Sequence, residues 1–328
     1  SQRSSLQRTM WKLCALLISL AVCATATSKV EQISVAYAAD PTQVYVTFAA
    51  VTDETTAQVK YGTSPDNLTQ SVQFSGSTYS FAAYTSPMLF KGVLPNLSSG
   101  NKLYYYSIGS DSLGYSPVNH FKTHPGIGVE DVTFHIFGDL GQTENSVTTL
   151  NELIAFEDNL TGKSGGIVSM GDLSYANGNQ PEWDTFGNMV TTATKQIPML
   201  STQGNHEWFD SANHDFRAYL ARFENPRVNG QQELYYSFDS GLVHFVMVAG
   251  YCKQMLSTQT QPCLAEGSPE MDWLQKDLAG VDRSVTPWVV AVFHQPYVNS
   301  NTAHSISTEG APMQKAIEDV LNQYKVDL

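Results

Sequence analysis

Four short apolar runs after residue 131 each lead into a polar loop with a residue able to bind a metal ion. These residues are Asp139, Asp172, Asn205 and His294. Carboxylate oxygens, amide oxygens and imidazole nitrogens are common metal ligands. A glycine directly precedes each of the first three, which suits a backbone that turns sharply and lets an ion approach. One such residue alone is more often a turn or surface residue, but the set of four indicates a shared metal centre.

The elements that must position these residues are strands of an α/β region. The apolar runs are nearly continuous, which is typical of strands buried on both faces, and they cover residues 132–137, 166–170, 197–201, 243–248 and 288–293. Helical patterns lie at 271–278 and 312–321. In α/β folds, ligands gather at the carboxyl ends of the strands. We therefore predict an α/β domain over residues 131–328 whose strand-end loops converge on one site.

Residues 30–124 have a different pattern. Short runs with alternating apolar residues, as in 43–48, 57–61 and 102–108, are separated by turn-forming stretches. Period-two patterning with a turn about every ten residues predicts an antiparallel β-sandwich of fibronectin III type. Because the segment carries no cluster of His, Asp and Glu, we interpret it as a scaffold.

The strand-end loops resemble those of the metallophosphoesterase superfamily, and within it the purple acid phosphatases of the large two-domain type found in plants and fungi. The segment from Gly171 to Tyr175 matches the GDxxY form of the purple subgroup, in which the tyrosine binds Fe(III). The resemblance covers nearly the whole mature chain, because it includes the β-sandwich, the stretches 273–283 and 286–288, and Glu309-Gly310.

This resemblance implies a dinuclear metal centre. Asp139 and Tyr175 would bind Fe(III), and Asp172 would bridge the two ions. Asn205 and His294 would bind a divalent Zn, Mn or Fe ion. Carboxylate and phenolate oxygens suit Fe(III), whereas an amide oxygen and an imidazole suit a divalent ion. The implied activity is that of an acid phosphatase, which hydrolyses phosphate monoesters by attack of a metal-bound hydroxide.

Two further histidines would face the substrate according to the resemblance. His206 would protonate the leaving alkoxide or hydrogen-bond the phosphate. His304 matches a second such histidine, but the plant-type enzymes often have a His-His pair where this chain has Ala303-His304. Leaving-group protonation is therefore expected to depend more on His206. By contrast, His135 and His244 lie inside apolar strands and are interpreted as structural.

The family completes its site with a Gly-His-x-His loop, which follows a strand after the last helix. This sequence stops at 325–328, where that strand would begin. We therefore expect the sequence to be a fragment that lacks two ligands, binds metal weakly and has little activity by itself. Two other interpretations stay open: a secreted binding protein without catalysis, and a generic metallophosphoesterase such as a phosphodiesterase or nucleotidase.

The first 26 residues resemble a secretory leader. Met10 and Lys12 precede an apolar run at 13–23 and the small residues Ala24-Thr25-Ala26. We expect residues 1–9 to lie upstream of the initiator methionine, Met10, and a signal peptide to be cleaved after Ala26. The alternative of a transmembrane helix is disfavoured, because the run is short of the ~18 to 20 residues that span a bilayer.

Other features agree with export. Cys252 and Cys263 stay in the mature chain and are predicted to form one disulfide. A metal pair is the weaker alternative, because no CxxC or Cys-His spacing accompanies them. Glycosylation sequons stand at Asn67, Asn96 and Asn159. We therefore predict a secreted glycoprotein.

Composition limits the class of partner. The chain of 328 residues has a formal net charge of -13 and is 42% hydrophobic and 11% aromatic, which is typical of a folded protein. It offers no basic stripe for nucleic acid or for an anionic membrane surface. The expected partner is a small phosphate-monoester substrate.

Overall fold

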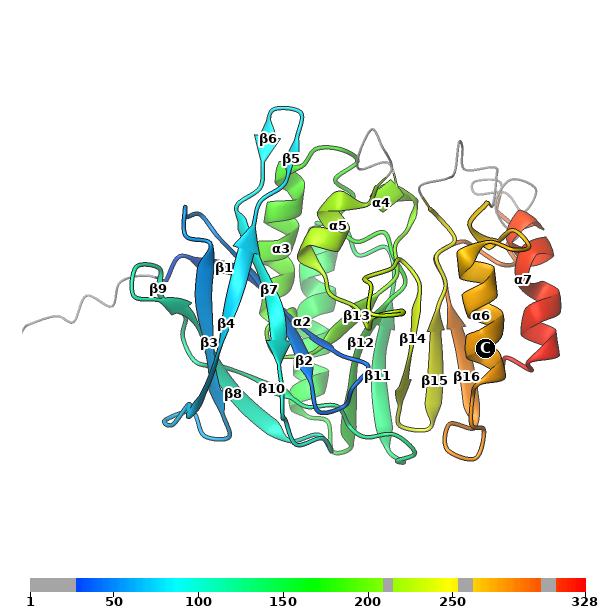
Figure 1. Cartoon of the computed structure of the whole chain (residues 1–328), viewed down its shortest axis with the longest axis horizontal. Helices are drawn as coiled ribbons and strands as arrows, with labels where there is room; N and C mark the ends of the chain where they lie inside the picture. The colour runs from blue at the N-terminus through cyan, green and yellow to red at the C-terminus, as the bar shows by residue number, and fades with distance from the viewer. Residues whose placement is uncertain (1–27, 209–214, 253–261, 302–310) are drawn as a thin grey trace, which may run out of the picture.

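The two ends of the chain differ in secondary structure, as the colours from blue to red in Figure 1 show. The computed structural model describes residues 28–208, 215–252, 262–301 and 311–328. In the described residues up to 122, the elements are the strands β1 (Val30–Tyr37), β2 (Val44–Ala50), β3 (Thr56–Gly62), β4 (Gln70–Ser77), β5 (Ser80–Phe81), β6 (Tyr84–Thr85), β7 (Met88–Leu94), β8 (Leu103–Ser110), β9 (Gly114–Tyr115) and β10 (Asn119–Lys122).

The remainder of the chain contains both strands and helices. The strands there are β11 (Val132–Phe137), β12 (Lys163–Ser169), β13 (Met199–Ser201), β14 (Tyr236–Ser240), β15 (Val243–Met247) and β16 (Trp288–Val292). The helices are α2 (Glu144–Asp158), α3 (Pro181–Thr194), α4 (Asn205–Trp208), α5 (Arg217–Arg222), the 3₁₀ helix η1 (Pro262–Leu264), α6 (Pro269–Ala279) and α7 (Ala311–Gln323).

Eight of the N-terminal strands form one antiparallel sheet that curls on itself, and β5 pairs with β6 in a separate two-stranded sheet. The strand order of the larger sheet is β1-β2-β7-β4-β3-β8-β10, with β9 paired to β8. Most of β4 pairs with β3, whereas its last residues, Ser75–Ser77, pair with β7. The two ends of the sheet approach each other, since the Tyr37 hydroxyl of β1 donates to the Lys122 carbonyl of β10 at 3.4 Å. The predicted all-β N-terminal region is confirmed, and β4 joins its two layers.

Aromatic side chains fill the space inside this curled sheet. Phe48 stacks on Phe90 with ring centroids 4.7 Å apart and lies 6.2 Å from Phe74. The outer face of β1 is covered as well, because α3 packs against it and the Thr194 hydroxyl donates to the Ile33 carbonyl at 2.8 Å. The N-terminal sheet therefore supports the α/β region directly, as a scaffold would.

The α/β region contains two three-stranded sheets. Strands β11, β12 and β13 are parallel, and β15 pairs parallel with β16 and antiparallel with β14. The two sheets meet where Phe134 packs edge-on against Phe245, with ring centroids 4.8 Å apart. Figure 1 shows α3 between the N-terminal sheet and β12, and α6 and α7 at the opposite end beside β16. The carboxyl ends of β11, β12 and β13 therefore lie along one edge.

Local signals explain where the helices begin. The Thr143 side chain accepts a hydrogen bond from the backbone N–H of Ser146, whose side chain in turn bonds the Thr143 backbone, so a capping box starts α2. Helix α6 starts after Ser268, which caps it, and has Pro269 in its first turn. Among the described residues, no helix has the length and apolar character that crossing a bilayer requires.

His244 has a structural environment. Its ring is buried between two carboxylates, with Nδ1 2.6 Å from Asp239 Oδ1 and Nε2 3.0 Å from Asp277 Oδ2. Burial alone would lower the pKa of His244, but the hydrogen bonds and charges of these two carboxylates outweigh it and raise the pKa to about 9. The imidazolium thus joins the β14–β15 hairpin to α6.

We expect this contact to make stability depend on pH. Because the pKa of His244 is raised from 6.5 to about 9, its stabilisation is complete below pH 6.5 and is lost as the pH rises through 9. The loss is at most about 3 kcal/mol, since one pKa unit corresponds to about 1.4 kcal/mol. Urea unfolding of the wild type and His244→Asn measures this: the two should differ below pH 6.5 and converge above 9. An equal difference at both pH values would contradict the prediction.

Candidate metal centre

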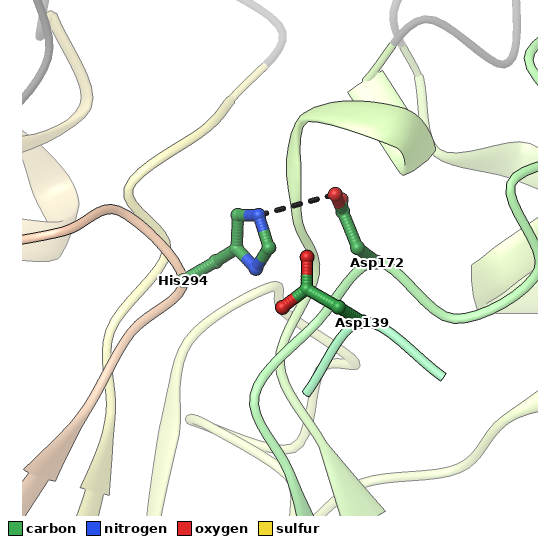
Figure 2. Close-up of side chains that lie close together, drawn as sticks. All are labelled: Asp139, Asp172 and His294. Atoms are coloured by element: carbon green, nitrogen blue, oxygen red, sulfur yellow. Dashed lines mark ion pairs between the residues drawn. The ribbon is translucent and has the colours of Figure 1, made fainter. Parts of the chain in front are cut away.

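The strand-end loops bring the predicted ligands together. Asp139, Asp172 and His294 each offer one ligand atom, and these atoms all lie within 4.8 Å of one another. Figure 2 shows the three side chains pointing toward a common space from the ends of three different strands. Two ligands of one ion with bonds of about 2.1 Å lie at most about 4.2 Å apart. A small inward shift of the side chains would therefore let them hold an ion.

The other two predicted ligands lie at the same place. The Tyr175 hydroxyl donates to Asp139 Oδ1 at 2.8 Å. His294 Nε2 lies 3.1 Å from Asn205 Oδ1 and 3.2 Å from Asp172 Oδ2. All five side chains thus form one cluster, with Tyr175 and Asp139 on one side and Asn205 and His294 on the other. Asp172 contacts His294 directly.

Strained backbone holds the acidic and phenolic residues in place. Asp139, Asp172 and Tyr175 have φ angles of 55°, 51° and 55°, in the left-handed region that L-residues rarely adopt. The adjoining glycines are required by close packing, because a Cβ on Gly204 would lie 2.0 Å from Asp172 Oδ1 and one on Gly171 would lie 2.8 Å from the Gly204 nitrogen. The glycines thus allow the two loops to pack closely, and the approach of an ion to them stays a prediction.

Hydrogen bonding fixes the orientation of His294. Its Nδ1 lies 2.8 Å from the Met170 carbonyl, so Nδ1 carries a hydrogen and donates, and Nε2 faces the cluster. Burial would lower the pKa of His294, but the Asp172 carboxylate outweighs it and raises the pKa to about 9. A metal ion at Nε2 would replace the proton that this carboxylate otherwise favours.

The Tyr175 phenol is held in its protonated form by its surroundings. Burial, reinforced by the hydrogen bond and charge of Asp139 and by the charge of Asp172, raises the pKa of Tyr175 above its usual value. Without a cation, the phenol therefore donates to Asp139. A trivalent ion would reverse this preference, because it stabilises the phenolate.

His206 lies at the rim of the cluster. Its Nε2 is 3.6 Å from Asp172 Oδ2, and its ring packs on Tyr175 with centroids 4.1 Å apart. Its Nδ1 is hydrogen-bonded to the side-chain oxygen of Asn177, whose φ of 50° is also left-handed. The sequence analysis did not identify Asn177. The available signal was an asparagine, which tolerates this conformation, two residues after a predicted ligand.

Glu207 is a second residue that the sequence analysis did not identify. Its carboxylate is buried and accepts hydrogen bonds from three backbone N–H groups, those of Asp172, Leu173 and Gly204. Burial and the charge of Asp172 raise the pKa of Glu207 to about 7, although the N–H groups counteract this. A glutamate immediately after Asn205 and His206 in a strand-end loop was the signal in the sequence.

The remaining predicted residues lie elsewhere. Cys252 and Cys263 form the predicted disulfide. Asn67, Asn96 and Asn159 are exposed, as glycosylation requires. His304 and the Glu309-Gly310 pair fall outside the described residues. His135 pairs with Glu157 at 3.0 Å, away from the cluster. A cavity of about 760 Å³ beside α6 is lined by His244, Trp273 and Asp277 and by none of the predicted ligands.

Comparison with known proteins agrees with the geometry. Residues 30–123 match the model described as "Purple acid Phosphatase, N-terminal domain", and residues 132–328 match "Calcineurin-like phosphoesterase". Purple acid phosphatase 22 of Arabidopsis thaliana is 34% identical over 304 residues, which are 88% of this chain and 64% of that protein. Phosphoenolpyruvate phosphatase of Allium cepa is 34% identical over 300 residues, which cover 88% and 58%.

A solved structure has the same fold. Purple acid phosphatase PPD1 from yellow lupin seeds superposes with a TM-score of 0.75 at 22% identity, over 92% of this chain and 57% of that one. The chain thus spans less than two thirds of the length of these relatives. With a family model matched over residues 132–328 and the N-terminal model over 30–123, the chain belongs to the purple acid phosphatases, within the calcineurin-like phosphoesterases.

Proposed function

We propose that this protein is a secreted acid phosphatase that hydrolyses phosphate monoesters at a dinuclear centre of Fe(III) and a divalent Zn, Mn or Fe ion. The observation that carries the proposal is the cluster of Asp139, Tyr175, Asp172, Asn205 and His294 at one sheet edge. A relative of 30% identity over 281 residues is named Fe(3+)-Zn(2+) purple acid phosphatase 12. The N-terminal sheet over 30–124 would serve as the scaffold of the catalytic domain, 131–328.

The donor chemistry of the cluster fits two unlike ions. Asp139 and Tyr175 supply the hard carboxylate and phenolate oxygens that suit Fe(III), and Asn205 and His294 supply an amide oxygen and an imidazole for the divalent ion. Asp172, buried between the two groups, would be shared. When bound, the ions supply Lewis acidity that neutralises phosphate charge and lowers the pKa of water.

The protein's own residues orient and protonate the substrate. Asn177 holds His206 through Nδ1, which leaves Nε2 directed toward the cluster, where it would donate a proton to the leaving oxygen. The chain has a formal net charge of -13, so the overall charge of the protein repels a phosphate anion. Binding of the anion therefore depends on cations at the cluster and on His206, with His304 as a second proposed contact.

Features of the chain also support secretion. A disulfide between Cys252 and Cys263 persists in oxidising compartments. The signal-like segment at 10–26 and the exposed sequons at Asn67, Asn96 and Asn159 fit the same route. We propose that the mature protein begins after Ala26.

Tyr175→Phe tests the identity of the centre. The purified product of the complete gene should show a visible tyrosinate-to-Fe(III) absorption band, because Tyr175 would bind Fe(III), and the variant should lose this band. Tyr297→Phe is a matched control in the loop after β16, where the ring packs on Phe293, and it should keep the colour. A colourless enzyme active with Zn or Mn alone would instead indicate a generic metallophosphoesterase. Absence of bound metal would favour a binding protein without catalysis.

A further inference from the structure

Glu207 is a carboxylate that lies completely inside the protein beside the metal cluster. Its exposed fraction is 1%. Its Oε2 accepts hydrogen bonds from the backbone N–H groups of Asp172 at 2.9 Å and Gly204 at 2.8 Å, and its Oε1 accepts one from Leu173 at 2.9 Å. Both oxygens thus face backbone N–H groups, so Glu207 is not positioned to be a metal ligand.

These hydrogen bonds join two loops that come from neighbouring strands. Asp172 and Leu173 follow β12, and Gly204 follows β13, which pairs parallel with β12. The loops touch through their backbones, because a Cβ on Gly171 would lie 2.8 Å from the Gly204 nitrogen. A carboxylate that accepts from both loops fixes their separation and the direction of each turn.

The turns need such support because the backbone is strained. Asp172 has a φ of 51°, a conformation that costs an L-residue of order 1 kcal/mol or more and persists only where its surroundings enforce it. The same turns remove the N–H groups of Asp172 and Leu173 from the pairing of β12 with β13. A buried N–H without an acceptor is costly, and Glu207 supplies acceptors for three of them.

We propose that Glu207 is a positioning residue that holds the Asp172 and Asn205 loops at the separation that two metal ions require. The proposal rests on the proposed metal centre. Glu207 acts on Asp172 through that residue's own N–H and on Asn205 through the N–H of the preceding Gly204. It therefore fixes a bridging ligand and a ligand of the divalent ion at the same time.

Glu207→Gln tests the proposal with the least change in shape. The amide keeps one acceptor oxygen but replaces the other with an NH₂ group, which faces a backbone N–H as donor against donor. We expect the affinity for Zn²⁺ to fall about 10- to 100-fold, the range for loss of a residue that supports a ligand. The measurement is calorimetric titration of Zn²⁺ into the chelator-stripped product of the complete gene.

Glu270→Gln is the matched control. Glu270 is also buried, with 4% of its surface exposed, and its Oε1 accepts from the backbone N–H of Ala249 at 2.6 Å, but it belongs to α6 and holds no predicted ligand loop. We expect this variant to lose thermal stability while its Zn²⁺ affinity stays at the wild-type value. If both variants lose similar thermal stability but only Glu207→Gln loses Zn²⁺ affinity, the result supports a positioning role for Glu207.

The outcomes separate this proposal from the proposed function. If the wild type binds Zn²⁺ and Glu207→Gln binds it equally well, Glu207 is only structural and the positioning role is overturned. If the wild type binds neither Zn²⁺ nor Fe(III), the metal centre fails and the positioning role fails with it. If Glu207→Gln does not fold, hydrogen exchange in the stripped wild type decides: the amides of Asp172, Leu173 and Gly204 should exchange slowly, and fast exchange at all three would overturn the proposal.

Discussion

Asp172→Asn is expected to lose metal binding and phosphatase activity by more than about 100-fold, because loss of a residue that merely supports a ligand already costs about 10- to 100-fold. Asp172 lies at the centre of the cluster, with Oδ2 3.2 Å from His294 Nε2 and Oδ1 accepting from the His206 backbone N–H at 3.0 Å. Asparagine has the same shape and tolerates the φ of 51°. The substitution therefore removes charge and bridging capacity while keeping the loop.

Asp131→Asn provides the control for this substitution. Asp131 also has a left-handed backbone, with a φ of 58°, but it is exposed and precedes β11 at the opposite end of the strand from Asp139. We expect the control to keep wild-type metal content and kcat/KM, measured on the product of the complete gene by elemental analysis and with a phosphate-monoester substrate. Full activity in Asp172→Asn would exclude it as a shared ligand.

Arg222→Met is expected to lower the free energy of unfolding by about 3 kcal/mol, the lower end of the range for breaking a buried ion pair, because Arg222 is buried but its partner Asp184 is 27% exposed. The guanidinium is 4% exposed and lies 2.7 Å from Asp184 Oδ1 in α3. It also donates to the Tyr79 hydroxyl at 2.7 Å and to the Tyr84 hydroxyl at 3.1 Å, and both tyrosines belong to the N-terminal region. The side chain therefore connects α5 and α3 with the β5–β6 hairpin and the residue that precedes it by one position, Tyr79.

Arg217→Met is the matched control in the same helix. Its ion pair with Asp215 has a similar distance, 2.7 Å, but the Arg217 side chain is 42% exposed. Exposed pairs contribute about 0 to 1 kcal/mol, so this variant should unfold at nearly the wild-type urea concentration. If the two variants lost equal free energy of unfolding, the burial of Arg222 would not be the reason for its contribution to stability.

The strands could be predicted where their composition is distinctive. Strand β11 occupies residues 132–137 as predicted from its mainly apolar run. The expected burial on both faces is not found, because β11 is an edge strand of its sheet and Ile136 is 51% exposed. Strand β14 was not predicted. Its burial alternates along Tyr236–Ser240, so it lacks the continuous apolar run, and its antiparallel pairing with β15 departs from the parallel pattern of its neighbours. It is a single alternating run among continuous apolar runs, whereas the alternating runs at 30–124 recur with turns between them and were predicted as strands for that reason.

Four of the candidate ligands could be named before the fold was seen, because each follows an apolar run and because parallel strands place their carboxyl ends together. The fifth, Tyr175, was named from the resemblance of Gly171–Tyr175 to the GDxxY form. Their distances and orientation required the structure. That Nε2 and not Nδ1 of His294 faces the cluster follows from the Met170 carbonyl, which belongs to a different strand-end loop and is 124 residues away in the sequence.

The sequence alone determined the residue types at the site, the order of the two regions and the resemblance to a phosphatase family, because these depend on periodicity and on short motifs. Only the tertiary structure assigned Asn177 to His206 and Glu207 to the two ligand loops. Both roles consist of hydrogen bonds to turns in which a residue, Asn177 or Asp172, has a left-handed backbone. Such contacts depend on which loops are neighbours in space and on the direction of single N–H groups, and neither quantity has a periodic signal along the chain.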